Sequence, residues 1–184
     1  MLVNLVPDFV DLEDSLEAIQ DFYETQGWTD GLPIIPPTEA RVREMFRYLD
    51  YEPDDVLALL EPLSGEATVQ RVAVNAVMAG CRPEYMPVLI AAVKAIAEPA
   101  FSLRAVQTTT HPCTVGLNVN GPLRDELSIN CGANCFGTGW RANATIGRAM
   151  RLILLNIGGG IPGEGDKATH GSPAKFTLCI GENE

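Results

Sequence analysis

Apolar residues recur at every third or fourth position along much of this chain, and this spacing predicts a largely helical protein. Asp11, Thr38 and Asn143 precede such stretches, where short polar side chains favour the first turn of a helix. Gly27 and Gly158 follow two of them, where glycine favours helix termination. We expect helices at about residues 11–26, 38–49, 54–61, 68–79, 84–97 and 143–157.

The remaining segments predict few strands and several long loops. Residues 108–120 are rich in β-branched side chains and alternate in polarity, and residues 176–180 form a similar short run, so both are expected strands. Prolines and a glycine make Trp28–Pro37 an irregular segment. Two or three strands are too few for a large sheet. We therefore expect an α+β fold: one helix-rich domain over residues 1–184 with a small sheet, which a further subunit would extend in an oligomer.

The charge is concentrated in the first third of the chain. The whole chain carries 24 acidic and 13 basic residues, a net charge of −11. Residues 1–66 hold 16 of the acids and three of the bases, which predicts an acidic helical N-terminal arm and a near-neutral core over residues 67–184. Because nucleic acids and anionic membranes attract basic surfaces, neither is an expected partner.

The five cysteines and the N-terminal sequence favour a cytoplasmic protein. No basic stretch precedes an apolar run at the N-terminus, so a secretory signal is not expected. In the reducing cytosol, cysteines are free thiols or metal ligands. No apolar run has the length of a membrane span, because Gly80–Glu84 interrupts the longest one.

Two histidines are the first candidates for catalysis. His111 and His170 both lie in loops among small polar residues, and imidazole is the natural acid or base near neutral pH. Asp30 and Asp166 are the carboxylates expected to orient them or to bind a metal. The alternative is that each imidazole only holds its loop in place through hydrogen bonds.

A metal site is the second hypothesis. His111, Cys113, Cys131 and Cys135 offer one nitrogen and three sulfur ligands, a set that suits zinc or iron. The spacing lacks a Cys-x-x-Cys pair, and a redox pair of Cys131 with Cys135 is a further alternative. The simplest alternative is that the cysteines are small buried apolar residues, as expected for Cys81 and Cys179.

A glycine-rich loop that leads into a helix is the third candidate, as a site for a small anionic substrate. Free backbone N–H groups and the helix dipole attract carboxylate or phosphate there. The alternative is a tight turn in which asparagines bond to the backbone. The expected substrate-binding residues are those of the loop, with two from the segment before Asp30 and one from a turn: Asn130, Asn134, Arg141, Asn143, Trp28, Thr29 and Asn120.

Several of these motifs together resemble a poorly characterised family of bacterial proteins. Members occur beside, or fused to, a short thioredoxin-like protein with a Sec/Cys-Gly-Ser-Cys (UGSC) motif. The resemblance covers residue 22 to the end and rests on Trp28-Thr-Asp-Gly-Leu-Pro33, Pro36-Pro37-Thr38, Asn75-Ala-Val-Met-Ala-Gly-Cys-Arg-Pro-Glu-Tyr85, Thr109-Thr-His-Pro112, Asn120-Gly-Pro122, Arg141-Ala-Asn-Ala-Thr-Ile-Gly-Arg148 and Asp166-Lys-Ala-Thr-His-Gly171.

The resemblance implies a two-part system whose small part carries a redox-active thiol or selenol. This chain lacks the Cys-Gly-Ser-Cys motif, so a separate subunit would supply it. We expect a lyase or oxidoreductase, or its substrate-binding subunit, that cleaves a carbon–heteroatom bond of a small anion by reduction or elimination. The alternatives are a non-catalytic scaffold subunit and a Cys/His metal protein.

Overall fold

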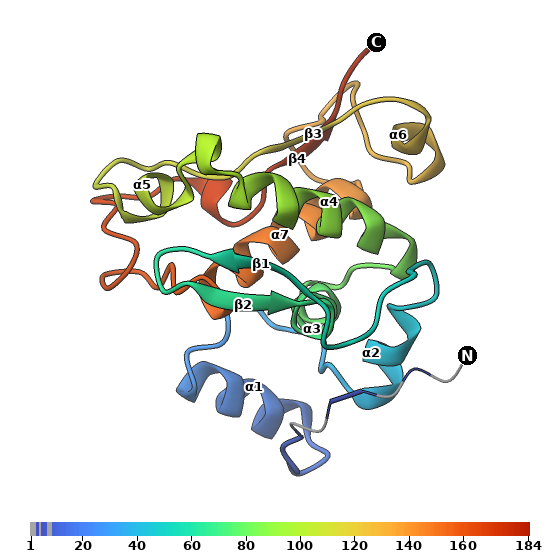
Figure 1. The fold of residues 1–184 in the computed structure, drawn as a ribbon, viewed down its shortest axis with the longest axis vertical. Coiled ribbons are helices and arrows are strands. Elements are labelled where there is room, and N and C mark those ends of the chain that lie inside the picture. Colours follow the sequence, from blue (N-terminus) through green and yellow to red (C-terminus); the bar gives the residue numbers. More distant parts are fainter. Residues whose placement is uncertain (1–2, 4, 7–8) are drawn as a thin grey trace.

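The computed structural model describes residues 3, 5–6 and 9–184 and has an α+β fold (Figure 1). Positions 1, 2, 4, 7 and 8, which contribute to the expectation about a secretory signal, lie outside the described residues. In this range the helices are α1 (Leu16–Thr25), α2 (Glu39–Glu44), α3 (Val69–Ala79), α4 (Met86–Ala97), α5 (Leu103–Thr108), α6 (Pro122–Glu126), α7 (Arg141–Asn156) and the short 3-10 helices Pro83–Tyr85, Pro99–Phe101 and Pro173–Lys175. The strands are β1 (Val56–Leu60), β2 (Gly65–Thr68), β3 (Leu117–Val119) and β4 (Cys179–Gly181).

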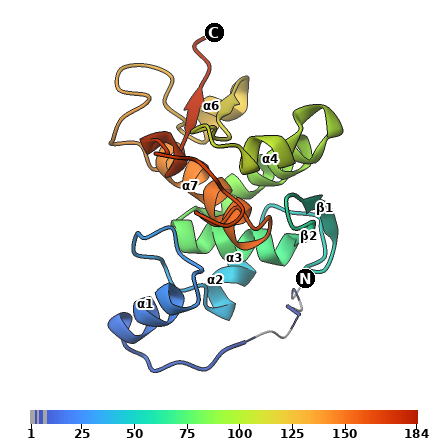
Figure 2. The same cartoon turned by 90° about the vertical axis from the view of Figure 1, so that its left-hand side faces the viewer.

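The core is built around α7, which packs against α3 and α4 (Figure 2). Its Ile146, Leu152 and Ile153 are fully buried, and Val72 and Leu89 of the neighbouring helices are buried with them. Because apolar side chains surround α3 on nearly all sides, this helix is covered on both faces. Among the described residues, no single helix is long and apolar enough to cross a membrane, and the only combination that reaches that length bends by 73°.

The strands form two separate pairs rather than one sheet. β1 and β2 make an antiparallel hairpin, and β3 pairs in parallel with β4. The helix expected at residues 54–61 is therefore wrong, because its apolar run Val56–Leu60 pairs with β2 instead. Gly65 permits this arrangement, since a Cβ atom there would lie only 1.9 Å from the Ile157 carbonyl oxygen.

Other element boundaries confirm or correct the predicted ones. Thr38 caps α2, as expected, by accepting a hydrogen bond from a backbone N–H group. Helix α1 begins at Leu16 with Ser15 as its cap, later than the predicted cap Asp11. Helix α7 begins at Arg141, so Asn143 lies within its first turn and bonds to a loop instead of capping the helix. The strand expected at residues 108–120 is reduced to β3.

The acidic first third of the chain is divided between an edge helix and the core. No residue of α1 is buried, and the helix lies at the edge of the molecule in both views (Figures 1 and 2). Gln20 attaches it by exchanging two hydrogen bonds with the backbone of Ile34. Val42 and Phe46, by contrast, belong to the main core. Residues 34–66 are therefore integrated with residues 67–184. Contacts to the body also occur before them, since Val6 exchanges two hydrogen bonds with Gln70, and Ile19 and Tyr23 pack against the core.

Candidate functional site

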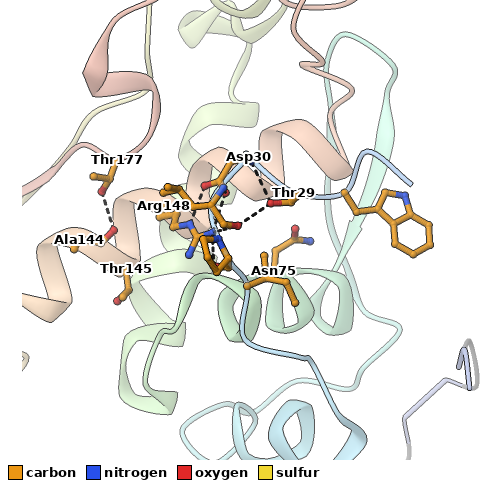
Figure 3. Close-up of polar contacts among 12 residues, drawn as sticks. Thr29, Asp30, Asn75, Ala144, Thr145, Arg148 and Thr177 are labelled. Atoms are coloured by element: carbon orange, nitrogen blue, oxygen red, sulfur yellow. Dashed lines mark hydrogen bonds and ion pairs between the residues drawn. The ribbon is translucent and has the colours of Figure 1, made fainter. Parts of the chain in front are cut away.

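The first half of α7 holds other segments of the chain in place. Arg148 forms a bidentate ion pair with Asp30, with both N–O distances 2.8 Å, and it also donates to the carbonyl oxygens of Leu32 and Pro33 (Figure 3). The Asp30 side chain is only 3% exposed. The geometry gives this carboxylate a structural partner and leaves it no access to a substrate.

The residues before Asp30 also have local partners. The Thr29 hydroxyl donates to the Leu32 carbonyl oxygen at 2.9 Å and accepts from the N–H group of Gly31. The backbone carbonyl of Trp28 accepts a hydrogen bond from Asn156 at the end of α7. The indole of Trp28 packs edge-on against two aromatic rings of α1 and remains partly exposed. This segment therefore acts as a clamp between α1 and α7.

The asparagines of the glycine-rich loop bond mainly to its own backbone. The buried Asn143 side chain accepts from the Asn130 N–H group at 2.8 Å and donates to the Asn130 carbonyl oxygen at 3.0 Å. The side chain of Asn130 bonds to Ala133 and Gly132, and that of Asn134 donates to Thr138. These bonds match the tight-turn alternative. Asn120 is exposed just after β3.

The loops that carry the two histidines lie side by side. The Thr169 N–H group donates to the Thr110 carbonyl oxygen at 3.0 Å, so the residues that follow, His170 and His111, are both near this contact. Both imidazoles are exposed, and the Nδ1 atom of His111 lies 3.3 Å from the Thr109 hydroxyl. Segments 59 residues apart in sequence thus converge.

A small cavity of about 20 Å³ lies beside these loops, which is enough space for one water-sized group. Cys113 lines it from the first histidine loop and Asp166 from the second. Arg151 of α7 and Lys175 complete its charged lining. The Thr114 hydroxyl donates to the Ala174 carbonyl oxygen at 3.1 Å, which holds the segment of Lys175 against that of Cys113. We call the cavity and the two loops the histidine-loop site.

The charges around this cavity do not balance. Lys175 Nζ lies 2.5 Å from the Asp166 carboxylate, and Arg151 lies 3.7 Å from the same oxygen atom. These three side chains are between 6% and 16% exposed. Burial lowers the pKa of Arg151, while Asp166 and Asp30 partly oppose this effect. Two cations therefore share one carboxylate in a poorly hydrated place.

The proposed metal ligands do not come together. Among the described residues, no three His, Cys, Asp or Glu side chains are placed to hold a metal ion, so the set His111, Cys113, Cys131 and Cys135 does not form such a site. Cys131 and Cys135 lie in the glycine-rich loop, which Asn143 holds at the N-terminal end of α7. The zinc or iron hypothesis therefore does not fit these residues.

Two of the cysteine thiols are buried and unreactive. Burial raises the pKa of Cys81 to about 12, although the side chain of Thr145 and nearby arginines oppose the rise. Burial also raises the pKa of Cys179 to about 12. Both are protonated at neutral pH and act as the small buried residues that the sequence indicates. Cys113, by contrast, is exposed at the cavity.

Sequence reasoning named Asp166 and both histidines as candidates but not the two cations beside Asp166. Arg151 interrupts the apolar stripe of α7, and a charged residue in a buried stripe is the signal that would have found it. Lys175 gives no comparable signal, because it lies in a single short 3-10 helix that has no periodic pattern. Comparisons of this chain with protein-family models, with curated proteins and with solved structures find no match for it.

Proposed function

We propose that this protein is an enzyme, or the substrate-binding subunit of one, that acts on a small anionic molecule at the histidine-loop site. The observation that carries the proposal is the group Arg151, Asp166 and Lys175 around one cavity. A chain with a net charge of −11 has here a local excess of one positive charge. An uncompensated buried charge is costly, and a bound anion would compensate it.

The size of the cavity suggests how such an anion binds. About 20 Å³ admits one water-sized group, so one oxygen atom of a carboxylate, sulfonate or phosphate would enter the cavity and the rest of the anion would stay outside it. Lys175 and Arg151 would meet the head group, and charge-assisted hydrogen bonds to it are stronger than neutral ones. The remainder of the molecule would then extend toward the exposed rim, where the histidine loops lie.

The histidines supply the proposed chemistry. In an eliminative reaction, one imidazole removes a proton from the carbon beside the anionic group, and the other donates a proton to the departing heteroatom. The bond to the heteroatom breaks as the carbon–carbon double bond forms, so no oxidant or reductant is needed. A reductive reaction would instead require the thiol or selenol of a partner subunit.

Anion binding is the direct test of this proposal. Acetate, sulfate and phosphate are titrated into the wild-type protein and into Lys175→Gln, with affinity measured by calorimetry and Tm by differential scanning. The matched control is Lys167→Gln, because Lys167 is exposed on the loop that precedes Lys175 and, within the described residues, its side chain bonds to the Gly163 carbonyl oxygen alone.

We expect at least one anion to bind the wild type and the control alike, and to bind Lys175→Gln at least tenfold more weakly. No binding by any of the three anions, or equal binding to all three proteins, would contradict the proposal.

A non-catalytic scaffold subunit is the second candidate function, and one observation favours it. Leu12 and Leu16, beside and within α1, are 38% and 60% exposed, and no residue of α1 is buried. Exposed apolar residues on an edge helix are typical of a docking surface. If docking is the main role, Leu12→Ser with Leu16→Ser would change the assembly state in light scattering, whereas Lys175→Gln would not.

A further inference from the structure

A second and larger cavity lies at the N-terminal end of α7. Its volume is about 210 Å³. Arg151 follows Arg141 by ten residues, so about 15 Å of helix separates this cavity from the histidine-loop site. Charged and aromatic side chains line it: Arg82, Glu84, Tyr85, Glu126, Trp140 and Arg141.

Several polar groups at this cavity have no partner in the part of the chain that the structure describes. Tyr85 is only 3% exposed, and its hydroxyl makes no hydrogen bond there. No side chain caps α7, and the N–H groups of its first residues, Arg141 and Ala142, are also free within the described residues. The Tyr85 hydroxyl is not one of the buried side-chain atoms that lack a partner, so it is open to the cavity that Tyr85 lines. A ligand with acceptor atoms would bond to it and to the free N–H groups of the helix.

Two of the four charged side chains at the cavity form an ion pair, and the other two have no partner of opposite charge among the described residues. Arg82 lies 3.8 Å from Glu84, which neutralises both. Arg141 donates only to the Gly80 carbonyl oxygen, at 2.9 and 3.1 Å, and no carboxylate of the described chain pairs with it. Glu126 has no cation partner among the same residues. One free cation and one free carboxylate therefore face the same space.

The Tyr85 hydroxyl is suited to donate a hydrogen bond. Burial raises its pKa, and the nearby Arg82 and Arg141 only partly oppose this effect. The group therefore remains protonated at neutral pH. A protonated phenol beside an arginine and a helix N-terminus is an arrangement that binds a carboxylate.

We propose that this cavity binds an amino acid as a zwitterion. Its carboxylate meets Arg141, the first N–H groups of α7 and the Tyr85 hydroxyl, and its ammonium group meets Glu126. The volume is below the roughly 300–1,000 Å³ of pockets for drug-sized ligands, which suits a molecule of amino-acid size. Trp140 provides an apolar wall for the side chain.

The test begins with the twenty common L-amino acids, each screened for a rise in Tm of the wild-type protein. The strongest is then compared by calorimetry with its deaminated acid and its decarboxylated amine. We expect both analogues to bind at least tenfold more weakly than the amino acid. No binding of any amino acid at millimolar concentration, or equal binding of the deaminated acid, would overturn the proposal.

Variants locate the binding. Glu126→Gln is expected to weaken binding of the amino acid at least tenfold and to leave that of the deaminated acid unchanged, and Tyr85→Phe is expected to weaken both. Glu98→Gln, exposed elsewhere on the surface, is the control and should match the wild type. An unchanged affinity in Glu126→Gln would count against the proposal. Lys175→Gln should leave this binding intact, which separates it from the function proposed for the histidine-loop site.

Discussion

Two buried ion clusters on α7 begin only three residues apart, and they differ in charge balance. Arg148 meets Asp30 one to one, with bidentate geometry and two further carbonyl acceptors (Figure 3). Arg151 shares Asp166 with Lys175, and a cavity adjoins all three. A balanced and fully bonded pair has no remaining capacity for a ligand, whereas an unbalanced group at a cavity has.

The comparison gives a physical way to separate structural from functional charges. Asp30 and Asp166 both lie in loops, and their side chains are only 3% and 6% exposed. Their partners distinguish them. The polar residues in the first half of α7 follow the same rule. Asn143 and Arg148 hold loops, whereas Arg141 lines a cavity and has no carboxylate partner among the described residues.

The largest loss of stability is expected when the balanced pair of Arg148 and Asp30 is broken. Asp30→Ala would leave the guanidinium of Arg148 buried without its anion, and breaking a buried pair in this way costs about 3–5 kcal/mol. The free energy of unfolding in urea measures the loss. Glu39→Gln is the control, because it removes an exposed pair with Arg43, for which about 0.5 kcal/mol is expected. A loss below about 1 kcal/mol for Asp30→Ala would remove the contrast between the clusters.

A packing change at Gly147, next to Arg148, should have the next largest effect on stability. A Cβ atom at Gly147 would lie 2.4 Å from the Thr177 hydroxyl oxygen and 2.5 Å from the Leu178 backbone nitrogen. Gly147→Ala should therefore destabilise the fold by about 1–3 kcal/mol, despite the better helix propensity of alanine. Gly132→Ala is the control, since its nearest neighbour would be at 3.6 Å. Equal melting temperatures for both variants would contradict this explanation.

The unbalanced cluster should tolerate the loss of one cation. Lys175→Gln leaves Asp166 with Arg151 and removes the excess positive charge, so we expect the free energy of unfolding in anion-free buffer to change by less than about 1 kcal/mol. Urea unfolding of Lys175→Gln and Asp30→Ala in the same buffer compares the two losses of stability. A loss as large as that of Asp30→Ala would mean that both clusters are structural.

The smallest effect on stability is expected at the histidines. His111→Ala and His170→Ala remove exposed side chains, so each should change the free energy of unfolding by no more than about 0.5 kcal/mol. Each should nevertheless abolish turnover of the anion that binds best. Unfolding followed by circular dichroism measures the stability, and product analysis measures the turnover. A fully active double variant would rule out the proposed acid–base role.

Local sequence patterns determined most of the helices. Thr38 and Thr68 cap helices because a short hydroxyl can accept the first free N–H groups, whatever the rest of the chain does. The apolar spacing of α3 and α7 needed no knowledge of their neighbours. The same local reasoning failed for residues 54–61, because an apolar run of this length suits a helix or a strand until a partner such as β2 is known.

The sequence alone also determined the acidic charge, the α+β class and the two polar loops that carry His111 and His170. Only the tertiary structure decided which charged groups meet. Asp30 and Arg148 are 118 residues apart, and Thr110 and Thr169 are 59 apart. Contacts over such separations depend on the packing of whole helices, and no local spacing encodes them. Tertiary packing therefore makes Asp30 structural and separates Arg141 from the histidines.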